Sequence, residues 1–524
     1  MTFKFSQRQL SWLAIASLSV FLLALAALRP LSLPDEGRYA DVGRWMLMSG
    51  DWLAPRLNGI PFFHKPPLLH WLQASAFAVM GVGAWSARCV PAVHAILMLV
   101  VMYLAVRSYA SEKMARDSVL ILGSSLGFLI AGQYVNHDML VASWISIAVW
   151  CFALSFQPQD KVDVRLSLMG FAACAMGLLS KGLIGFVLPG MVMFVWLMWT
   201  GQMGRIKQMP WVRGVLLWSA IGLPWFVVGQ LHYSDLFNYL IIGQHFSRYV
   251  GDEFNNQWGW WFYVAVLTVL LFPWSLLILQ DLRPLQWFKI WRSERQVRSH
   301  HFVSLLWVWT LCIGLFFSLP KSKIVGYILP VLPPMACLGA LAWQKCLSRG
   351  RSLGLFNAML VTSLALSAVL NWQAGKYSLK HSSQDIAQVL ACAMDSQDRV
   401  YVSGGYPYDL PFYAQLQKPV YVAIDWGQAR VDHIDNWSRE LYEGVHFDEQ
   451  AGQVLVPVAA IQHPSTPSWL VVPHDSDIHA LTDAWTVYAQ GKAWLLLRAK
   501  SSALESPPTA QDESLNRCQP QRSH

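Results

Sequence analysis

Long apolar runs recur along most of the chain, and they restrict its fold more than any other feature. A helix needs about 20 apolar residues to cross a bilayer, with roughly 17 as the lower limit. About eleven runs meet or approach that length. They cover residues 11–28, 89–106, 118–135, 139–156, 166–180, 182–200, 214–231, 260–280, 302–319, 324–343 and 353–371. The sequence therefore predicts a polytopic α-helical membrane protein.

The charge content agrees with that class. Only 13% of the 524 residues are charged, whereas roughly a quarter is usual in soluble proteins. The 27 Trp residues also fit, because Trp concentrates where lipid meets water. A net charge of +8 raises the question of nucleic-acid binding. The basic residues alternate between loops, however, and such alternation indicates membrane orientation.

Lys and Arg are enriched in cytoplasmic loops. Here the N-terminal segment is basic, and so is every second loop after it, with clusters at 107–116, 161–165, 205–213, 283–298 and 345–351. The loops between them are poorer in bases. We therefore expect a cytoplasmic N-terminus and, with an odd number of spans, a C-terminus outside the cytoplasm.

From residue 376 the composition changes to short apolar segments separated by turn residues. Strands are expected at 398–403, 419–424, 453–457, 469–472 and 493–498, with an amphipathic helix at 383–394. The chain is thus predicted to have three parts. They are a transmembrane domain (1–375) with a large outer loop (29–88), an outer α/β domain (376–500) and a disordered tail (501–524).

Charged residues gather in the segments that this topology places on the outer face. The first loop contains Asp35, Glu36 and Arg38, and further along it Lys65 precedes two prolines. The acids follow Pro34, so they also suit an ordinary helix start, where they complement the helix dipole. Lys65 also suits a position among lipid headgroups.

Other outer segments carry similar groups. Asp138 is expected at the outer end of a span, where a carboxylate is costly unless it is paired or functional. His245 and Arg248 are three residues apart and share a face if their segment is helical. The remaining bases on this face are Lys181, Lys321 and Lys323. Taken singly, each segment is explained as well by a solvated helix end, an amphipathic surface helix or a lipid anchor.

Together these segments suggest one kind of chemistry. Cations stabilise a phosphate or pyrophosphate in a half-dry site, and a carboxylate removes the proton from an attacking hydroxyl or amine. The GxGxxG and GxxxxGKS/T fingerprints of nucleotide sites are missing from the sequence. A lipid-borne phosphate donor fits better, because its tail lies in the bilayer and its headgroup at the interface.

The motifs resemble those of the polytopic GT-C glycosyltransferases that use polyprenyl-phosphate sugars. The resemblance is strongest to the aminoarabinose transferase (ArnT-like) branch, with the protein O-mannosyltransferases as more distant relatives. It rests on segments that follow the family's order: DEGRYA from Asp35, HKPP from His64, SKG from Ser180, QHFSRY from Gln244, KSK from Lys321 and YILP from Tyr327.

The resemblance implies an inverting sugar transfer from undecaprenyl phosphate on the periplasmic side of a bacterial inner membrane. It implies that Asp35 is the base or orients the acceptor, and that Asp138 is a second candidate for catalysis or sugar binding. Lys65 and Arg248 would hold the lipid phosphate. The other substrate-binding candidates are Glu36, Arg38, Lys181, His245, Lys321, Lys323 and Tyr327.

The sugar and the acceptor stay open at this level. The candidate sugar is 4-amino-4-deoxy-L-arabinose, and the candidate acceptors are lipid A, another glycan or a protein. Gly37 stands where the family often has Thr, and His64 and Gln244 stand where ArnT-like proteins often have Glu. No cofactor is firmly implied. Some family members bind a divalent metal, for which His64 and His245 are candidate ligands; two scattered His are more often ordinary polar residues, and no metal site is assigned.

The alternative function is that of a transporter or flippase for an anionic lipid-linked substrate. A transporter of this kind is expected to carry ionisable groups near the bilayer midplane and to contain inverted repeats. Neither is evident in the sequence, whose non-cytoplasmic charges gather at one face.

Overall fold

The computed structural model describes residues 6–157, 161–247, 256–281, 298–432, 436–464 and 467–500. The segment predicted as a tail, 501–524, lies outside them. The chain forms two compact units. Unit 1 comprises Met1–Ala27, His64–Leu69 and Arg88–Asn371, and unit 2 comprises Leu28–Phe63, His70–Ala87 and Trp372–His524.

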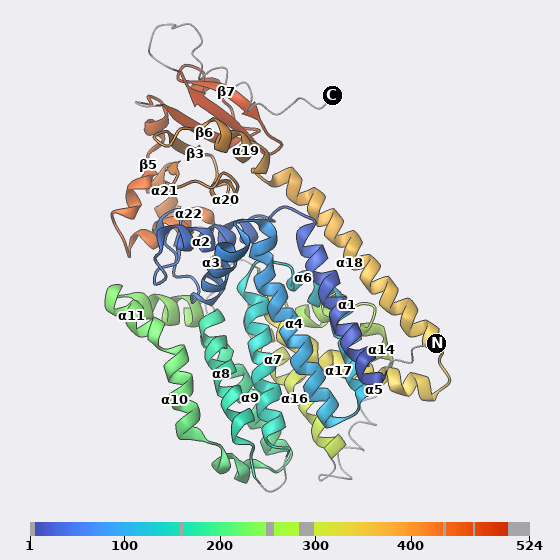
Figure 1. The fold of residues 1–524 in the computed structure, drawn as a ribbon. Coiled ribbons are helices and arrows are strands. Elements are labelled where there is room, and N and C mark those ends of the chain that lie inside the picture. Colours follow the sequence, from blue (N-terminus) through green and yellow to red (C-terminus); the bar gives the residue numbers. More distant parts are fainter. Residues whose placement is uncertain are drawn as a thin grey trace. The chain divides into compact units, whose positions relative to one another are not determined.

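Unit 1 is built from apolar helices around one large hydrophobic core that includes Trp150, Trp309 and Trp343. Its elements, with α4 and α18 belonging to it for most of their length, are α1 (Gln7–Ala27), α4 (Ala84–Tyr109), α5 (Glu112–Ser124), α6 (Leu126–Ala131), α7 (His137–Ser155), α8 (Val164–Lys181), α9 (Ile184–Trp199), η1 (Met203–Gln208), α10 (Trp211–Gly222), α11 (Pro224–His232), η2 (Asn238–Ser247), α13 (Phe262–Leu270), α14 (Ser275–Asp281), α16 (Arg298–Ser318), η3 (Val325–Val331), α17 (Leu332–Ser348) and α18 (Leu353–His381) (Figure 1).

The predicted class, a polytopic helical membrane protein, is confirmed. Among the described residues, seven helices are long and apolar enough to cross a membrane: α1, α4, α7, α8, α16, the stretch from η3 through α17, and α18. The pair α10 and α11, bent by 44°, makes an eighth if it counts as one span. Each of these corresponds to one of the apolar runs found in the sequence.

The other three apolar runs form shorter or broken helices. Residues 182–200 give α9, with 16 residues, and residues 260–280 divide into α13 and α14. Residues 118–135 are interrupted at Ser125, whose backbone is extended. The interruption is buried, and the hydroxyl of Ser363 donates to the Ser124 carbonyl at 2.5 Å. A non-helical residue is tolerated among apolar helices when protein groups satisfy its backbone in this way.

Unit 2 combines the segment after α1 with the C-terminal part of the chain. From the first it takes α2 (Asp35–Ser49), β1 (Arg56–Leu57), β2 (Ile60–Pro61) and most of α3 (Leu68–Met80). The second contributes α19 (Gln384–Ala393), β3 (Arg399–Ser403), α20 (Leu410–Tyr413), β4 (Tyr421–Ala423), α21 (Trp426–Asp432), α22 (Trp437–Val445), η4 (Ala451–Val454), β5 (Leu455–Val456), η5 (Val458–Ile461), β6 (Ser468–Pro473), η6 (His479–Leu481), β7 (Trp485–Gln490) and β8 (Trp494–Ala499).

A six-stranded sheet with the order β5-β4-β3-β6-β8-β7 organises unit 2. The strands β5, β4, β3 and β6 are mutually parallel, and β8 and β7 add an antiparallel edge. Each of the five expected strands and the expected helix is present. The edge strand β7 was not predicted; its burial follows no regular alternation, and its pairing with β8 is irregular between Val487 and Ala489.

The two sequence segments of unit 2 share one hydrophobic core. Val42 of α2 and Ile60 of β2 belong to the same buried cluster as Leu390, Val402 and Trp469. The burial of apolar surface is the main stabilising term in folding. The loop that carries the DEGRYA motif is therefore shaped by packing against residues more than 300 positions further along the chain.

The helices α8 and α9 approach each other most closely at two glycines. A Cβ added at Gly185 would lie 2.1 Å from the Gly177 carbonyl carbon, so the contact is backbone against backbone.

We expect Gly185→Ala to separate the helices and to lower the unfolding free energy by roughly 1–3 kcal/mol. Thermal unfolding of the full-length protein in detergent measures the effect. Gly190→Ala, on the same helix but facing open space, is the matched control; equal melting temperatures would contradict the close contact.

Candidate functional site

Asp138 and Lys181 meet at the same end of two packed helices. Asp138 lies in the first turn of α7, which Asn136 caps by accepting from the Asp138 amide at 2.9 Å. Lys181 is the last residue of α8. Because a short loop joins α7 to α8, the helices run antiparallel and bring these residues together. The ammonium of Lys181 donates to Oδ1 of Asp138, and each side chain is only 10% exposed.

The segment before α17 closes over this ion pair. A Cβ on Gly326 would lie 2.0 Å from Oδ2 of Asp138, so only glycine leaves room for the carboxylate. The Nζ atom of Lys181 lies 4.4 Å from the centre of the Tyr327 ring, a distance at which a cation is attracted to the ring face. Asp138, Lys181 and Tyr327, which were predicted separately, therefore form one cluster.

Lys321 and Lys323 lie on the strand-like segment that leads into η3. Lys323 is buried and donates from Nζ to the Trp258 carbonyl at 2.8 Å, and burial lowers the pKa of its ammonium. Lys321 is exposed, and its carbonyl accepts from the Trp258 amide at 3.1 Å. Tyr263 donates to the Ile324 carbonyl at 3.1 Å. Lys323 thus holds the backbone of this segment, while Lys321 presents its charge outward.

Of the other residues predicted in unit 1, Lys65 and His64 are described, whereas Arg248 and the side chain of His245 are not. The Lys65 ammonium is half-buried and donates to the His64 carbonyl at 3.0 Å. The His64 ring packs edge-on against Tyr239, with 5.9 Å between ring centres. Arg248 lies outside the described residues. His245 falls within η2, but its side chain is likewise not described.

Asp35 and Arg38 form the charged cluster of unit 2. Asp35 is the first residue of α2 and Arg38 follows three residues later, so the two share a face of the helix. Arg38 donates to Oδ1 of Asp35. The same guanidinium donates to Glu440 on α22, and the Tyr408 hydroxyl donates to the other oxygen of Glu440 at 2.6 Å. The side chain of Asp35 is 35% exposed, whereas that of Arg38 is 13% exposed.

The electrostatics of this cluster favour a fixed positive charge. Burial by itself lowers the pKa of Arg38, but Tyr39, Glu440 and Asp35 more than offset that effect, so the pKa is raised. The pKa of Tyr408 is also raised, by burial and then by the neighbouring Glu440 charge. Arg38 is therefore a permanent cation that orients the Asp35 carboxylate.

Glu36 faces the interior of unit 2. Its side chain is fully buried and forms an ion pair with Arg29, and it also accepts from the Ser32 amide at 2.8 Å. Arg29 donates in turn to the Ser32 hydroxyl at 2.8 Å. Because the Glu36 carboxylate is buried and paired, it can affect a substrate only indirectly, by shaping the loop around it.

Six of the predicted residues therefore fall into two groups, Asp35 with Arg38 and Glu36 in unit 2, and Asp138 with Lys181 and Tyr327 in unit 1. Among the described residues, no three His, Cys, Asp or Glu side chains lie close enough together to hold a metal ion.

Residues 64–227 match the family model described as dolichyl-phosphate-mannose-protein mannosyltransferase. An undecaprenyl phosphate-alpha-4-amino-4-deoxy-L-arabinose arabinosyl transferase of Pseudomonas fluorescens is 32% identical over 379 residues, 70% of this chain and 63% of that protein. A protein of the same description from Pseudomonas aeruginosa is 31% identical over 370 residues, 70% of this chain and 65% of that one.

The fold has a solved counterpart. The crystal structure of ArnT from Cupriavidus metallidurans bound to undecaprenyl phosphate matches with a TM-score of 0.77 at 23% identity, covering 94% of this chain and 98% of that one. The chain is similar to the ArnT-like transferases, in sequence over about 70% of its length and in fold over nearly all of it. The resemblance inferred from its motifs is thereby confirmed, together with the GT-C fold. The chain spans less than two thirds of the length of the two Pseudomonas relatives.

Sequence reasoning missed several residues that position the charges of this chain. Glu440 and Tyr408, which hold Arg38, come from a part of the sequence without a recognisable motif. A Cβ on Gly37 would lie 2.7 Å from Leu33 and 3.1 Å from the Asp409 amide nitrogen, so the chain has little room there for any side chain. Glu440, Tyr408 and Gly37 are recognised only from their contacts in the folded structure.

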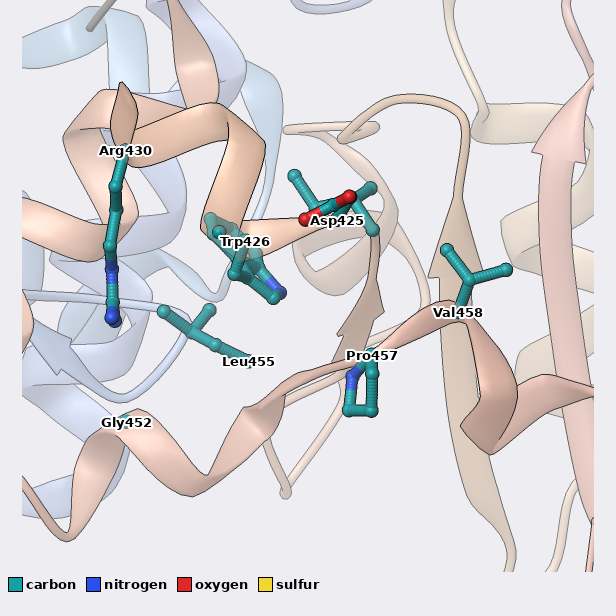
Figure 2. Close-up of a pocket in the computed structure, with 9 residues that line it drawn as sticks. Asp425, Trp426, Arg430, Gly452, Leu455, Pro457 and Val458 are labelled. Carbon is teal, nitrogen blue, oxygen red and sulfur yellow. The ribbon is translucent and has the colours of Figure 1, made fainter. Parts of the chain in front are cut away.

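A separate hollow of about 500 Å³ lies where β4 and β5 end (Figure 2). Ligands of α/β sheets usually bind where the strand order reverses, which here is between β3 and β6. Asp425 caps α21 by accepting from the Gln428 amide at 2.9 Å, and Trp426 donates to the Val422 carbonyl at 3.1 Å. These two lining residues maintain local structure, and none of the motif residues lines the hollow.

The burial of the Asp138–Lys181 pair can be tested by removing first one of the two charges and then both. Lys181→Met leaves the carboxylate without its cation, which typically costs about 3–5 kcal/mol of unfolding free energy. The double variant Lys181→Met/Asp138→Asn removes the uncompensated charge, so we expect it to recover much of that loss. Unfolding curves of the three proteins in one detergent compare them. A double variant no more stable than Lys181→Met would refute the buried pair.

Proposed function

We propose that this protein is an integral membrane glycosyltransferase that moves a sugar from undecaprenyl phosphate to an acceptor outside the cytoplasm. Relatives described as undecaprenyl phosphate-aminoarabinose arabinosyl transferases support the reaction class. The observation that carries the proposal is the pairing of acids with bases in this chain, Asp35 with Arg38 and Asp138 with Lys181. A transport function would not account for the pairing of Asp35 with Arg38 within one helical turn.

The proposed reaction is an inverting displacement. The acceptor oxygen or nitrogen forms a bond to the anomeric carbon while the bond from that carbon to the lipid phosphate breaks. The phosphate leaves with the electron pair, and a carboxylate takes the acceptor's proton. Asp35 is the better base, because its side chain is 35% exposed. Asp138 is 10% exposed and paired with Lys181, which suits sugar binding.

Basic residues supply charge for the leaving phosphate. Lys65 and Arg248 are assigned to the lipid phosphate, with Lys181, Lys321 and Lys323 as supporting charge; His245 and Tyr327 are assigned to the donor. Fixed cations that face a developing negative charge lower the barrier most in a site with little water. Glu36 and Arg38 are assigned to shaping and orienting the loop that presents Asp35.

The sugar proposed is 4-amino-4-deoxy-L-arabinose, and the acceptor is a periplasmic lipid such as lipid A, with another glycan or a protein as alternatives. The names of the relatives support the sugar. The proposed location is the bacterial inner membrane, with a cytoplasmic N-terminus and the sheet domain in the periplasm. The alternating basic loops support this orientation.

The catalytic assignment predicts a separation of turnover from binding. Asp35→Asn should abolish sugar transfer, because the amide cannot accept the proton, while undecaprenyl phosphate still binds. Lys65→Ala and Arg248→Ala should weaken that binding instead. Transfer assays and lipid-binding titrations of the purified variants measure both properties. Near-normal turnover by Asp35→Asn would remove its role as base, and unchanged lipid affinity in both cation variants would remove the phosphate clamp.

The substrates can be identified by mass spectrometry of envelope lipids and polyprenyl-phosphate sugars, with and without the gene. We expect loss of the gene to remove an aminoarabinose mass from one class of envelope molecule and to leave the lipid-linked sugar to accumulate. An Asp35→Asn copy should behave like the deletion. Identical profiles with and without the gene would contradict the proposed transfer.

A further inference from the structure

Unit 1 contains an apolar cavity of about 640 Å³ that none of the motif residues lines. Its walls come from α7, α8, α9, η1 and α10, all of which belong to the same unit. Phe156, Phe171, Met193 and Trp218 are among the lining residues, and the walls are almost wholly apolar. The cavity is open at one side, where the lining residue Phe194 is 53% exposed. We call it the α8–α10 groove.

The groove runs along these helices from the end that is remote from Asp138 and Lys181 as far as Phe186, which follows Lys181 by five residues. Asp138 begins α7, whereas Phe152 and Phe156 lie at its other end. Eighteen residues separate Asp138 from Phe156, which is about 27 Å along a helix. Neither Asp138 nor Lys181 lines the groove, so the groove is distinct from the cluster assigned to the donor sugar.

The same end of the helices is basic. The two segments there, 161–165 and 203–213, contain Lys161, Arg165, Arg205, Lys207 and Arg213 against one acid, Asp163. Asp163 caps α8 by accepting from the Leu166 amide at 3.0 Å. The two segments at this end of the groove thus contain more basic than acidic residues.

One of these cations is tied directly to a lining residue. Arg205 donates to the Phe156 carbonyl at 2.8 Å, and its guanidinium carbon lies 5.5 Å from the centre of the Phe156 ring. Lys207 follows the lining residue Ile206, and Arg213 lies two positions after Trp211. The indole of Trp211 donates to the Ile206 carbonyl at 2.9 Å, which holds η1 against the start of α10.

We propose that the α8–α10 groove binds an anionic phospholipid. Its acyl chain lies among the aromatic and Met side chains, and its phosphate lies at the basic end. An apolar wall accepts a hydrocarbon chain without loss of hydrogen bonds, and basic pockets between transmembrane helices attract anionic headgroups. Charge complementarity favours an anionic over a zwitterionic lipid. The site does not depend on the sugar transfer proposed above.

The apolar part of the site is tested by filling the groove. Gly190 lines it, and a Cβ added there would meet no heavy atom within 4 Å, so Gly190→Leu places a side chain in the cavity without a clash. Gly314 on α16 has the same open surroundings and lies outside the groove, which makes Gly314→Leu the matched control. Thermal unfolding of full-length protein is followed as phosphatidylglycerol is added in detergent.

Wild type and Gly314→Leu should gain melting temperature with added phosphatidylglycerol, because a ligand that binds the folded state stabilises it. Gly190→Leu should start from a similar melting temperature and gain little. If Gly190→Leu gains as much as wild type, the groove is not the lipid site. Native mass spectrometry of the same samples should show one fewer retained phospholipid in Gly190→Leu; equal lipid counts would also overturn the proposal.

The charged part of the site is tested without altering the groove. Phosphatidylglycerol should bind more tightly than phosphatidylcholine with the same acyl chains. The exposed pair Lys207→Gln/Arg213→Gln should reduce that preference by about fivefold for each charge removed. Arg349→Gln/Arg351→Gln, which removes two exposed bases elsewhere, is the control and should keep the preference. Equal affinity of wild type for both lipids, or an equal loss in the control, would refute an anionic headgroup site.

Discussion

A charge among apolar helices is costly unless an opposite charge meets it, and this constraint fixes the arrangement of the candidate site residues. In unit 1 it joins Asp138 at the start of α7 to Lys181 at the end of α8. In unit 2 it joins Glu36 to Arg29 and sets Arg38 between Asp35 and Glu440. These ion pairs leave Asp35 as the more exposed of the two candidate catalytic carboxylates.

The proposed chemistry follows from that difference in exposure. A general base has to reach the proton of the acceptor, which an accessible carboxylate does more readily than one enclosed by Lys181, Gly326 and the neighbouring ring of Tyr327. The basic residues divide in a similar way. The basic residues near the motifs suit a lipid phosphate. Those in the segments 161–165 and 203–213 lie near one end of an apolar groove and suit a membrane lipid.

Much of the architecture was predictable, because its signals are local. Apolar runs identify seven single spans and one bent pair among the described helices, and short apolar segments identify five of the six strands in the sheet. The interruption at Ser125 was not predictable, since nearby apolar residues conceal it and the compensating hydroxyl comes from Ser363. The edge strand β7 was missed because one of its faces is largely exposed.

The sequence by itself determined the membrane class, the candidate charges and the resemblance to ArnT-like transferases, because hydropathy and motifs are read from neighbouring residues. Only the tertiary structure decided which charges are paired, which are buried and which residues support them. Glu440 lies 402 positions from Arg38, and Lys181 lies 43 positions from Asp138. Such partners are selected by the packing of helices and strands, and the free energy of a charge depends on that surrounding packing rather than on its neighbours in sequence.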